Sequence, residues 1–249
     1  MRRSEPEWRY ARGWTRQELE QRLASLRSLP HDTTAESRMN PAHGYGQHFS
    51  EALIAIESHG PPASDGPFER ARPVIDGYVF SDPRIVTGHF DPRDPLVGRP
   101  MLLEFHVWGL RYLCGVRVSA QRDERGEEKT VFGYRYHTVP PHIESGAEWF
   151  LLTKHHDTGE VRFRIEAMWR PGQFPNWWSR AGFAVLARRR QRAWHRLAHL
   201  RLRSLVAAPE TVTVPRDRAL VDEGPLLEAP SIHSLESPRR TCSEMEVET

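Results

Sequence analysis

The sequence predicts an α+β protein in which a largely antiparallel sheet of about six or seven strands packs against one long C-terminal helix. Residues 130–169 hold three strand-like segments joined by two turns, and short connections of this kind favour antiparallel pairing. Residues 180–205 repeat apolar residues at helical spacing, so one face of this helix can cover the sheet. Two shorter helices are expected near the N-terminus.

The three segments between residues 130 and 169 differ in which of their faces are apolar. Thr130–Thr138 carries bulky residues at every second position, and Gly159–Trp169 alternates apolar with charged residues, as half-buried strands do. Gly146–Lys154 is apolar on both faces and is bounded by turn residues. The polar turn at residues 156–159 favours a tight hairpin, and Pro140 begins a wider connection. These patterns predict a three-stranded meander.

A simple register of both hairpins brings one carboxylate into apolar surroundings. The expected pairs are Leu152 opposite Phe163, Phe150 opposite Ile165, Glu148 opposite Ala167, and Tyr136 beside Glu148. Glu148 then shares a face with Phe150 and Leu152, where a carboxylate must be hydrogen-bonded, paired or protonated. The polar groups that this register could bring near Glu148 belong to Tyr136, Thr138, His142 and Arg170.

Helices are predicted in three places. The first covers Arg16–Ser28, because a capping-box pattern begins at Thr15 and leucines follow at helical spacing. The second covers Gln47–Glu57, where three apolar residues form a narrow stripe. Gly60–Pro73 has the composition of a loop. The long amphipathic helix follows near Arg180.

Four further strands are expected between the second helix and the meander, because the apolar pattern changes there to a period of two. They are Val74–Phe80, Arg84–Phe90, Met101–Trp108 and Leu110–Asp123.

We expect residues 15–207 to form a single domain, with residues 1–14 flexible and an acidic tail at 208–249 disordered. The tail holds few aromatic residues, several prolines and no sustained period. The 38% of hydrophobic residues supply enough bulk for a core. No apolar run approaches the ~20 residues of a membrane span, and no apolar segment follows the charged start, so a cytoplasmic location is expected.

The most distinctive motifs lie in the same central stretch, in Gly133–Val139 (GYRYHTV) and Pro141–Phe150 (PHIESGAEWF). On these motifs the chain resembles the uncharacterised DUF1990 family, also called UPF0548, with its Gly-His-Pro-Glu and Gly-Glu-Glu-x-Phe signature. Pro141 and Ile143 stand where that family usually has Gly and Pro. Ala147 replaces the first Glu of the pair, and Glu148 fits the second.

The resemblance implies a helix-grip fold similar to START and Bet v 1 proteins, in which a curved antiparallel sheet wraps a long C-terminal helix and encloses a cavity. The family has no established activity to carry over. Such folds often bind apolar small molecules, although a fold alone does not fix a function. We therefore expect a binding protein, more favoured than an enzyme, for a small apolar or amphipathic ligand held between the sheet and the helix.

The candidate pocket residues are Tyr134, Tyr136, Thr138, His142, Glu148, Phe150, Phe163 and Arg170. Glu148 could act there as a tuned acid or base. Alternatively, Glu148 accepts hydrogen bonds from a tyrosine or from Arg170 and only locks the end of the sheet. Catalysis is the less favoured role, because no nucleophile and base stand at a recognisable motif.

Metal and nucleotide sites are not expected. His155 and His156 are neighbours on a strand end, so their side chains point to opposite faces and cannot easily share a metal ion. The chain also lacks the glycine-rich phosphate-binding motifs and the Cys-x-x-Cys motif. We expect neither a metal nor a cofactor.

An alternative function uses the C-terminal helix. From Ala167 to Pro209 there are nine Arg and no Asp or Glu, whereas Glu210–Thr249 holds nine acidic residues and four Arg. The candidate surface for an anionic partner consists of Arg188, Arg189, Arg192 and Arg196. The acidic tail is expected to contact this basic helix within the chain. Nucleic acid is not the expected partner, because the net charge is only +2.

Overall fold

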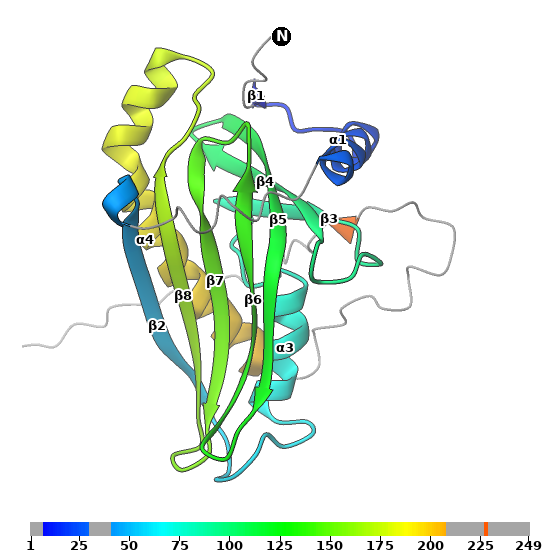
Figure 1. The fold of residues 1–249 in the computed structure, drawn as a ribbon, viewed down its shortest axis with the longest axis vertical. Helices are drawn as coiled ribbons and strands as arrows, with labels where there is room; N and C mark the ends of the chain where they lie inside the picture. Colours follow the sequence, from blue (N-terminus) through cyan, green and yellow to red (C-terminus); the bar gives the residue numbers. More distant parts are fainter. Residues whose placement is uncertain (1–6, 30–40, 208–226, 229–249) are drawn as a thin grey trace, which may run out of the picture.

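The computed structural model describes residues 7–29, 41–207 and 227–228. Its nine-stranded sheet is antiparallel and has the order β2-β8-β7-β6-β5-β4-β3-β9, with β1 paired to β5. Figure 1 shows the sheet curving around the long helix α4, with α3 beside it. This is the helix-grip arrangement that the resemblance implies.

The strands are β1 (Glu7–Tyr10), β2 (Gly46–Ile56), β3 (Val86–Phe90), β4 (Pro100–Val107), β5 (Leu110–Arg125), β6 (Lys129–Val139), β7 (Glu144–His155), β8 (Glu160–Pro171) and β9 (Leu227–Glu228). The helices are α1 (Arg16–Ser28), α3 (Pro67–Asp76) and α4 (Trp177–Ala207), with a short 3-10 turn, η1 (Pro41–His43).

The central meander has the predicted register. Leu152 pairs with Phe163, Phe150 with Ile165, Glu148 with Ala167, and Tyr136 with Glu148. The first four of these side chains are fully buried, so β7 and β8 turn their apolar face toward α4. The prediction is confirmed because alternation and turn length together leave little freedom in the pairing.

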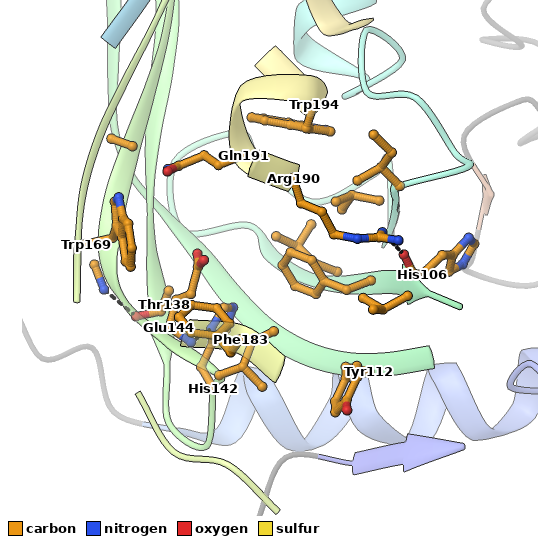
Figure 2. A pocket seen from close by; sticks show the side chains of 18 of the residues that line it. His106, Tyr112, Thr138, His142, Glu144, Trp169, Phe183, Arg190, Gln191 and Trp194 are labelled. Atoms are coloured by element: carbon orange, nitrogen blue, oxygen red, sulfur yellow. Dashed lines mark hydrogen bonds between the residues drawn. The ribbon is translucent and has the colours of Figure 1, made fainter. Parts of the chain in front are cut away.

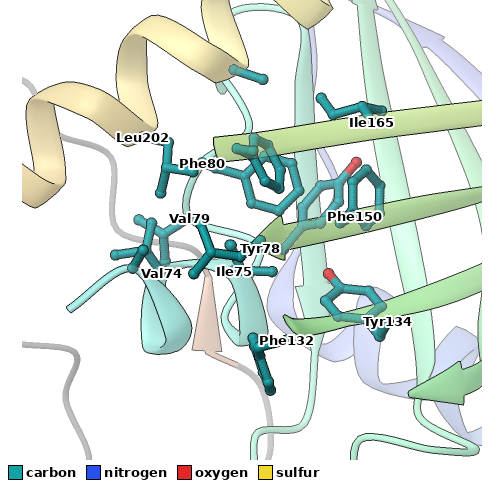
Figure 3. Packing of buried hydrophobic residues seen from close by; sticks show 14 of the residues in the cluster. Val74, Ile75, Tyr78, Val79, Phe80, Phe132, Tyr134, Phe150, Ile165 and Leu202 are labelled. Carbon is teal, nitrogen blue, oxygen red and sulfur yellow. The ribbon is translucent and has the colours of Figure 1, made fainter. Parts of the chain in front are cut away.

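One half of the concave face of the sheet is filled by side chains. The turn after α3 brings Phe80 against Phe150 and Phe163, with ring centroids 4.9 and 5.2 Å apart. Tyr134 is fully buried in the same cluster, and Leu202 closes it from α4 (Figure 3). This cluster, called the filled half below, holds α3, α4 and the sheet together.

Residues 46–56 form strand β2, so the helix predicted over Gln47–Glu57 is wrong. Exposure alternates along β2, and Phe49 and Ile56 are 62% and 66% exposed. The apolar stripe that suggests a helix therefore points to solvent. Three inward positions that face α4 hold the polar or small residues His48, Ser50 and Ala52, and Ile54 joins the core further along.

Residues 67–76 form helix α3, so the loop predicted over Gly60–Pro73 and the strand predicted over Val74–Phe80 are wrong in this part. Pro67 stands in the first turn, where its missing N–H costs no hydrogen bond. Pro73 lies inside the helix. Proline normally ends a helix, so Pro73 makes the residues before it resemble a loop. The apolar residues after it then resemble the start of a strand, although both parts belong to α3.

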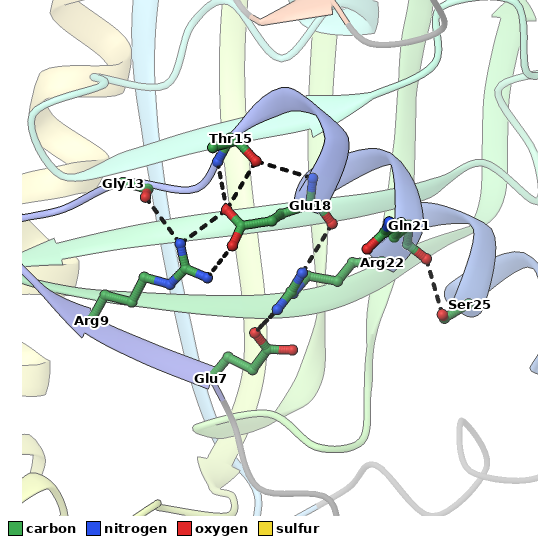
Figure 4. Close-up of polar contacts among 8 residues, drawn as sticks. All are labelled: Glu7, Arg9, Gly13, Thr15, Glu18, Gln21, Arg22 and Ser25. Atoms are coloured by element: carbon green, nitrogen blue, oxygen red, sulfur yellow. Dashed lines mark hydrogen bonds and ion pairs between the residues drawn. The ribbon is translucent and has the colours of Figure 1, made fainter.

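The N-terminal elements are joined by polar contacts (Figure 4). The predicted capping box of α1 is present, with the Thr15 and Glu18 side chains each accepting from the other residue's backbone N–H. Glu18 also pairs with Arg9 of β1 at 2.5 Å, and this guanidinium lowers the pKa of Glu18 to about 2. Residues 7–10, expected to be flexible, form β1 beside β5.

A buried ion pair fixes the opposite end of the sheet. Lys154 of β7 is 0% exposed, and its Nζ lies 2.9 Å from Glu57 Oε2 and donates to the Ser58 carbonyl at 2.8 Å. Glu57 Oε1 accepts from the Phe68 N–H at 2.5 Å. The carboxylate therefore caps α3, whose N-cap residue, Gly66, offers no side chain.

Of the tail expected to be disordered, Leu227–Glu228 pairs with β3 as β9. The expected contact between the acidic tail and the basic helix lies outside the described residues. Among the helices that the structure describes, none has both the length and the apolar character needed to cross a membrane.

Candidate ligand-binding site

The other half of the concave face encloses a cavity of about 320 Å³. Its walls come from the sheet, from the hairpin between β4 and β5, and from the N-terminal part of α4 (Figure 2). The row Tyr136, Glu148, Ala167 across β6, β7 and β8 marks its border with the filled half. Among the elements that the structure describes, no helix equivalent to α3 covers this half, which leaves the cavity open.

Most of the cavity wall is apolar. Its larger apolar residues include Ile85, Val86, Leu103, Phe105, Val107, Leu110, Ile143, Met168, Trp169, Phe174, Phe183 and Trp194. Trp108 and Trp178, which are 74% and 37% exposed, also line it. A concave apolar surface with few polar groups is typical of small-molecule sites.

Glu148 connects the cavity to α4. Tyr136 Oη donates to Glu148 Oε2 at 2.6 Å, and His195 Nε2 lies 3.6 Å from Glu148 Oε1. Burial and the Glu148 charge raise the pKa of Tyr136 well above its usual value, so the phenol stays a donor. His48, Ala167 and Glu148 lie side by side on β2, β8 and β7. Because the Ala167 side chain is small, the His195 imidazole can lie over it, next to His48 and facing Glu148.

His142 and Glu144 supply the less engaged polar groups of the cavity. The Glu144 N–H donates to His142 Nδ1 at 2.9 Å, which leaves the ring proton on Nε2 when the imidazole is neutral. Burial lowers the pKa of His142 to about 3, so the ring is neutral at physiological pH. His142 Nε2 is buried and has no hydrogen-bond partner within the described parts of the chain.

The surroundings of Glu144 favour its neutral form. Burial, and then the charge of Glu148, raise the pKa of Glu144 to about 7. The side chain is only partly covered because it faces the hollow of the cavity rather than bulk water. Figure 2 shows Thr138, His142 and Glu144 gathered on one side, while the Arg190 guanidinium reaches toward the His106 carbonyl, at 2.5 Å, on another.

The structure divides the predicted pocket residues into three groups. Tyr136, Thr138, His142 and Glu148 line the cavity. Tyr134, Phe150 and Phe163 lie in the filled half and do not line it. Arg170 is exposed on the outer side, where its guanidinium stacks on Tyr45 and donates to the His43 carbonyl at 3.2 Å. Of the two partners considered for Glu148, Arg170 is therefore not the one that contacts it, and the tyrosine is.

Sequence reasoning missed Glu144 and His195 as site residues. A signal existed for Glu144, because it occupies the Glu position of the Gly-His-Pro-Glu signature. It also has the same strand parity as Glu148: the two are an even number of residues apart, so their side chains lie on the same face of the strand. No local signal existed for His195. Its contact with Glu148 depends on how α4 is rotated against the sheet.

The candidate arginine surface is only partly described. Arg189, Arg192 and Arg196 are exposed on α4, and the side chain of Arg188 lies outside the description. Arg192 and Arg196 border a groove beside β2. Within the described ranges, no group of three or more His, Cys, Asp or Glu side chains is arranged to hold a metal ion.

Residues 30–200 match the family described as "Domain of unknown function (DUF1990)". Among solved structures, the chain is similar to Ara h 8.0201, with 11% identity, a TM-score of 0.37 and coverage of 65% of this chain and 99% of that chain. It is similar to the major latex-like protein 151 of Panax ginseng, with 13% identity, a TM-score of 0.33 and coverage of 60% and 96%.

A putative uncharacterized protein from Rhizobium leguminosarum is similar at 10% identity, with a TM-score of 0.32 and coverage of 66% and 97%. No curated protein matches the chain. Because the match to the family over residues 30–200 includes more than half of its length, the chain belongs to the DUF1990 family.

Proposed function

We propose that this protein is a non-catalytic binding protein for a small amphipathic ligand, which occupies the cavity between the sheet and α4. The observation that carries the proposal is the unequal filling of the concave face. Side chains fill one half, whereas the other half keeps about 320 Å³ behind mainly apolar walls. This volume lies near the lower end of the range of small-molecule pockets, about 300–1,000 Å³.

The polar groups of the cavity favour an uncharged ligand with a hydrogen-bonding group. His142 Nε2–H offers a donor that no described residue of the chain satisfies. Glu144 can accept, or donate when it is protonated. Glu148 is engaged by Tyr136 and His195 and therefore mainly holds the wall in place. We assign polar recognition of the ligand to His142 and Glu144, and a positioning role to Glu148.

Gly182 of α4 provides a selective test. It lines the cavity, and a Cβ built on it would meet no atom within 4 Å. Gly182→Trp should therefore fill part of the hollow without a backbone clash. Titration with the neutral fluorophore N-phenylnaphthylamine should give at least about tenfold weaker binding to this variant than to wild type, equivalent to about 1.4 kcal/mol.

Gly182→Ala is the matched control. It leaves the hollow open and should bind the fluorophore as wild type does, while its thermal midpoint rises because alanine favours the helix by about 1 kcal/mol over glycine. Equal binding by the Trp and Ala variants, with both folded by circular dichroism, would show that the fluorophore binds elsewhere and would reject the proposed site.

A further inference from the structure

A groove distinct from the cavity runs along the edge of the sheet between β2 and α4, with a volume of about 400 Å³. Its polar lining consists mainly of His48 and Ser50 from β2 and Arg192, His195, Arg196 and His199 from α4. The four helix residues follow the i, i+3, i+4, i+7 spacing of one helix face, and the two strand residues share strand parity. The side chains of these two strand residues and four helix residues therefore all face the same groove.

The floor of the groove is a hydrogen-bonded cluster centred on Ser50. Its Oγ lies 2.7 Å from His195 Nδ1 and 2.8 Å from His199 Nε2. A hydroxyl has one proton, so at least one of these imidazoles must donate to it. His199 Nδ1 is buried without a hydrogen-bond partner among the described residues.

The described lining of the groove carries positive charge, and Glu148, which lines the cavity, lies 3.6 Å from His195 Nε2. The side chains of Arg192 and Arg196 are exposed, and the described part of the chain gives them no ion pair. No acidic residue in the described part of the chain lines the groove. Glu51, also on β2, has the opposite parity and pairs with Arg162 at 3.3 Å on the outer face. Burial, and then the charges of His195 and Arg192, lower the pKa of His48.

We propose that the groove binds a phosphate group, either as a phosphate monoester or as inorganic phosphate, at a site separate from the cavity. The two guanidinium groups of Arg192 and Arg196, one helical turn apart, offer more N–H donors than the two oxygens of a carboxylate can use. A phosphate, with several acceptor oxygens and a higher charge, matches this set. Ala52 and Leu200 add apolar surface for the organic part of a monoester.

Arg189 supplies a matched control, because it is an exposed arginine of the same helix that does not line the groove. The folded full-length chain would be titrated calorimetrically with phenyl phosphate at constant ionic strength. The double variant Arg192→Gln, Arg196→Gln should bind at least about tenfold more weakly, since a hydrogen bond to a charged group contributes about 1.5–3 kcal/mol. Ser50→Ala should weaken binding by a smaller factor, and Arg189→Gln should match wild type.

Two further arms identify the source of the phosphate. Phosphatidylcholine vesicles with and without phosphatidic acid test a lipid headgroup, and inorganic phosphate tests the free ion. The site is supported if the vesicles with phosphatidic acid or inorganic phosphate bind to wild type and to Arg189→Gln but not to the double variant. The probe that binds then identifies the source of the phosphate. Equal weakening by Arg189→Gln and the double variant would reveal only general attraction to a basic helix. That result, or no binding of any of the three probes to wild type, would overturn the proposal.

Discussion

Two carboxylates of β7 face the same cavity but stand in different surroundings. Glu148 is contacted at both oxygens, by Tyr136 and by His195. Glu144 faces the hollow, and its pKa is raised to about 7 by burial and by the charge of Glu148. Near neutral pH, Glu144 is therefore divided between its charged and neutral forms, and its protonation should respond to whatever occupies the cavity.

This difference predicts pH-dependent binding at Glu144. An apolar ligand that displaces water from Glu144 favours the neutral carboxyl, so binding takes up protons. By linkage, the affinity for N-phenylnaphthylamine should fall as the pH rises from about 6 to about 8. His142 does not contribute in this range, because its pKa is about 3.

Fluorescence titrations at several pH values and constant ionic strength would measure this effect. Glu144→Gln, which stays neutral, should give a flat affinity profile. A profile for Glu144→Gln that is as steep as that of wild type would mean that another group controls the pH dependence.

At the residue scale, strand parity decides what the sequence can predict about the site. Parity places Glu148 beside Tyr136 and opposite Ala167, as the structure confirms. The same parity places Arg170 on the outer face, since it pairs with Ser145 rather than with a cavity residue. Proximity in the chain to the strand end suggested Arg170 but was misleading. The contact of His195 depends on helix rotation, which no local pattern specifies.

At the element scale, Lys154 and Glu57 join β7 to the start of α3. Lys154→Met should lower the free energy of unfolding by about 3–5 kcal/mol, because it leaves the Glu57 carboxylate buried without its countercharge. Adding Glu57→Gln should recover part of the loss, since the amide oxygen can still accept from Phe68. Urea unfolding would measure both changes.

Lys129 is the matched control for this prediction, because it is exposed at the start of the neighbouring strand. Lys129→Met should change the unfolding free energy by no more than about 0.5 kcal/mol. If Lys154→Met were equally mild, the buried pair would not be what joins α3 to the sheet.

The two misassigned elements share one physical cause. In β2 and α3, packing against α4 and the sheet determines the conformation, and the local pattern points elsewhere. β2 is an edge strand with small and polar inward residues, so its larger apolar residues mimic a helical stripe. α3 continues past Pro73, which interrupts its pattern. The long meander strands and α1 carry their own alternation or cap, and they were therefore predictable.

At the scale of the whole molecule, His195 lies between the two candidate sites. Its Nδ1 contacts Ser50 in the groove, and its Nε2 faces Glu148 at the cavity. A phosphate that draws the Ser50 hydroxyl into the groove would turn the His195 ring away from Glu148 and so disturb the cavity wall that Glu148 holds in place. Phosphate should therefore weaken the binding of N-phenylnaphthylamine by at least about twofold, and the fluorophore should weaken phosphate binding equally.

Fluorophore titrations with and without inorganic phosphate, at matched ionic strength, would measure this coupling. It should vanish in His195→Asn and in the double arginine variant. Weakening that persists in the double arginine variant would instead indicate that phosphate competes inside the cavity. Fluorophore affinity that does not respond to phosphate in wild type would mean that the sites are independent.

The sequence and the family resemblance together predicted the helix-grip architecture but not which part of it is hollow. The position of α3 determines which half is hollow. The turn after α3 places Tyr78 and Phe80 against the concave face of the sheet and fills that half, so the cavity remains in the other half. Because a loop and a strand are predicted in place of α3 and its turn, the sequence does not reveal that Tyr134, Phe150 and Phe163 are core residues rather than cavity walls.

The burial of Lys154 also bears on the chemical reactivity of the protein. The chain has only two lysines among its 35 basic Lys and Arg residues, Lys129 and Lys154. With Lys154 fully enclosed, Lys129 is the single side-chain amine that an acylating reagent can reach in the folded protein. A fluorescent dye or an affinity tag coupled through lysine would therefore attach at one defined point, at the start of β6 and away from both candidate sites.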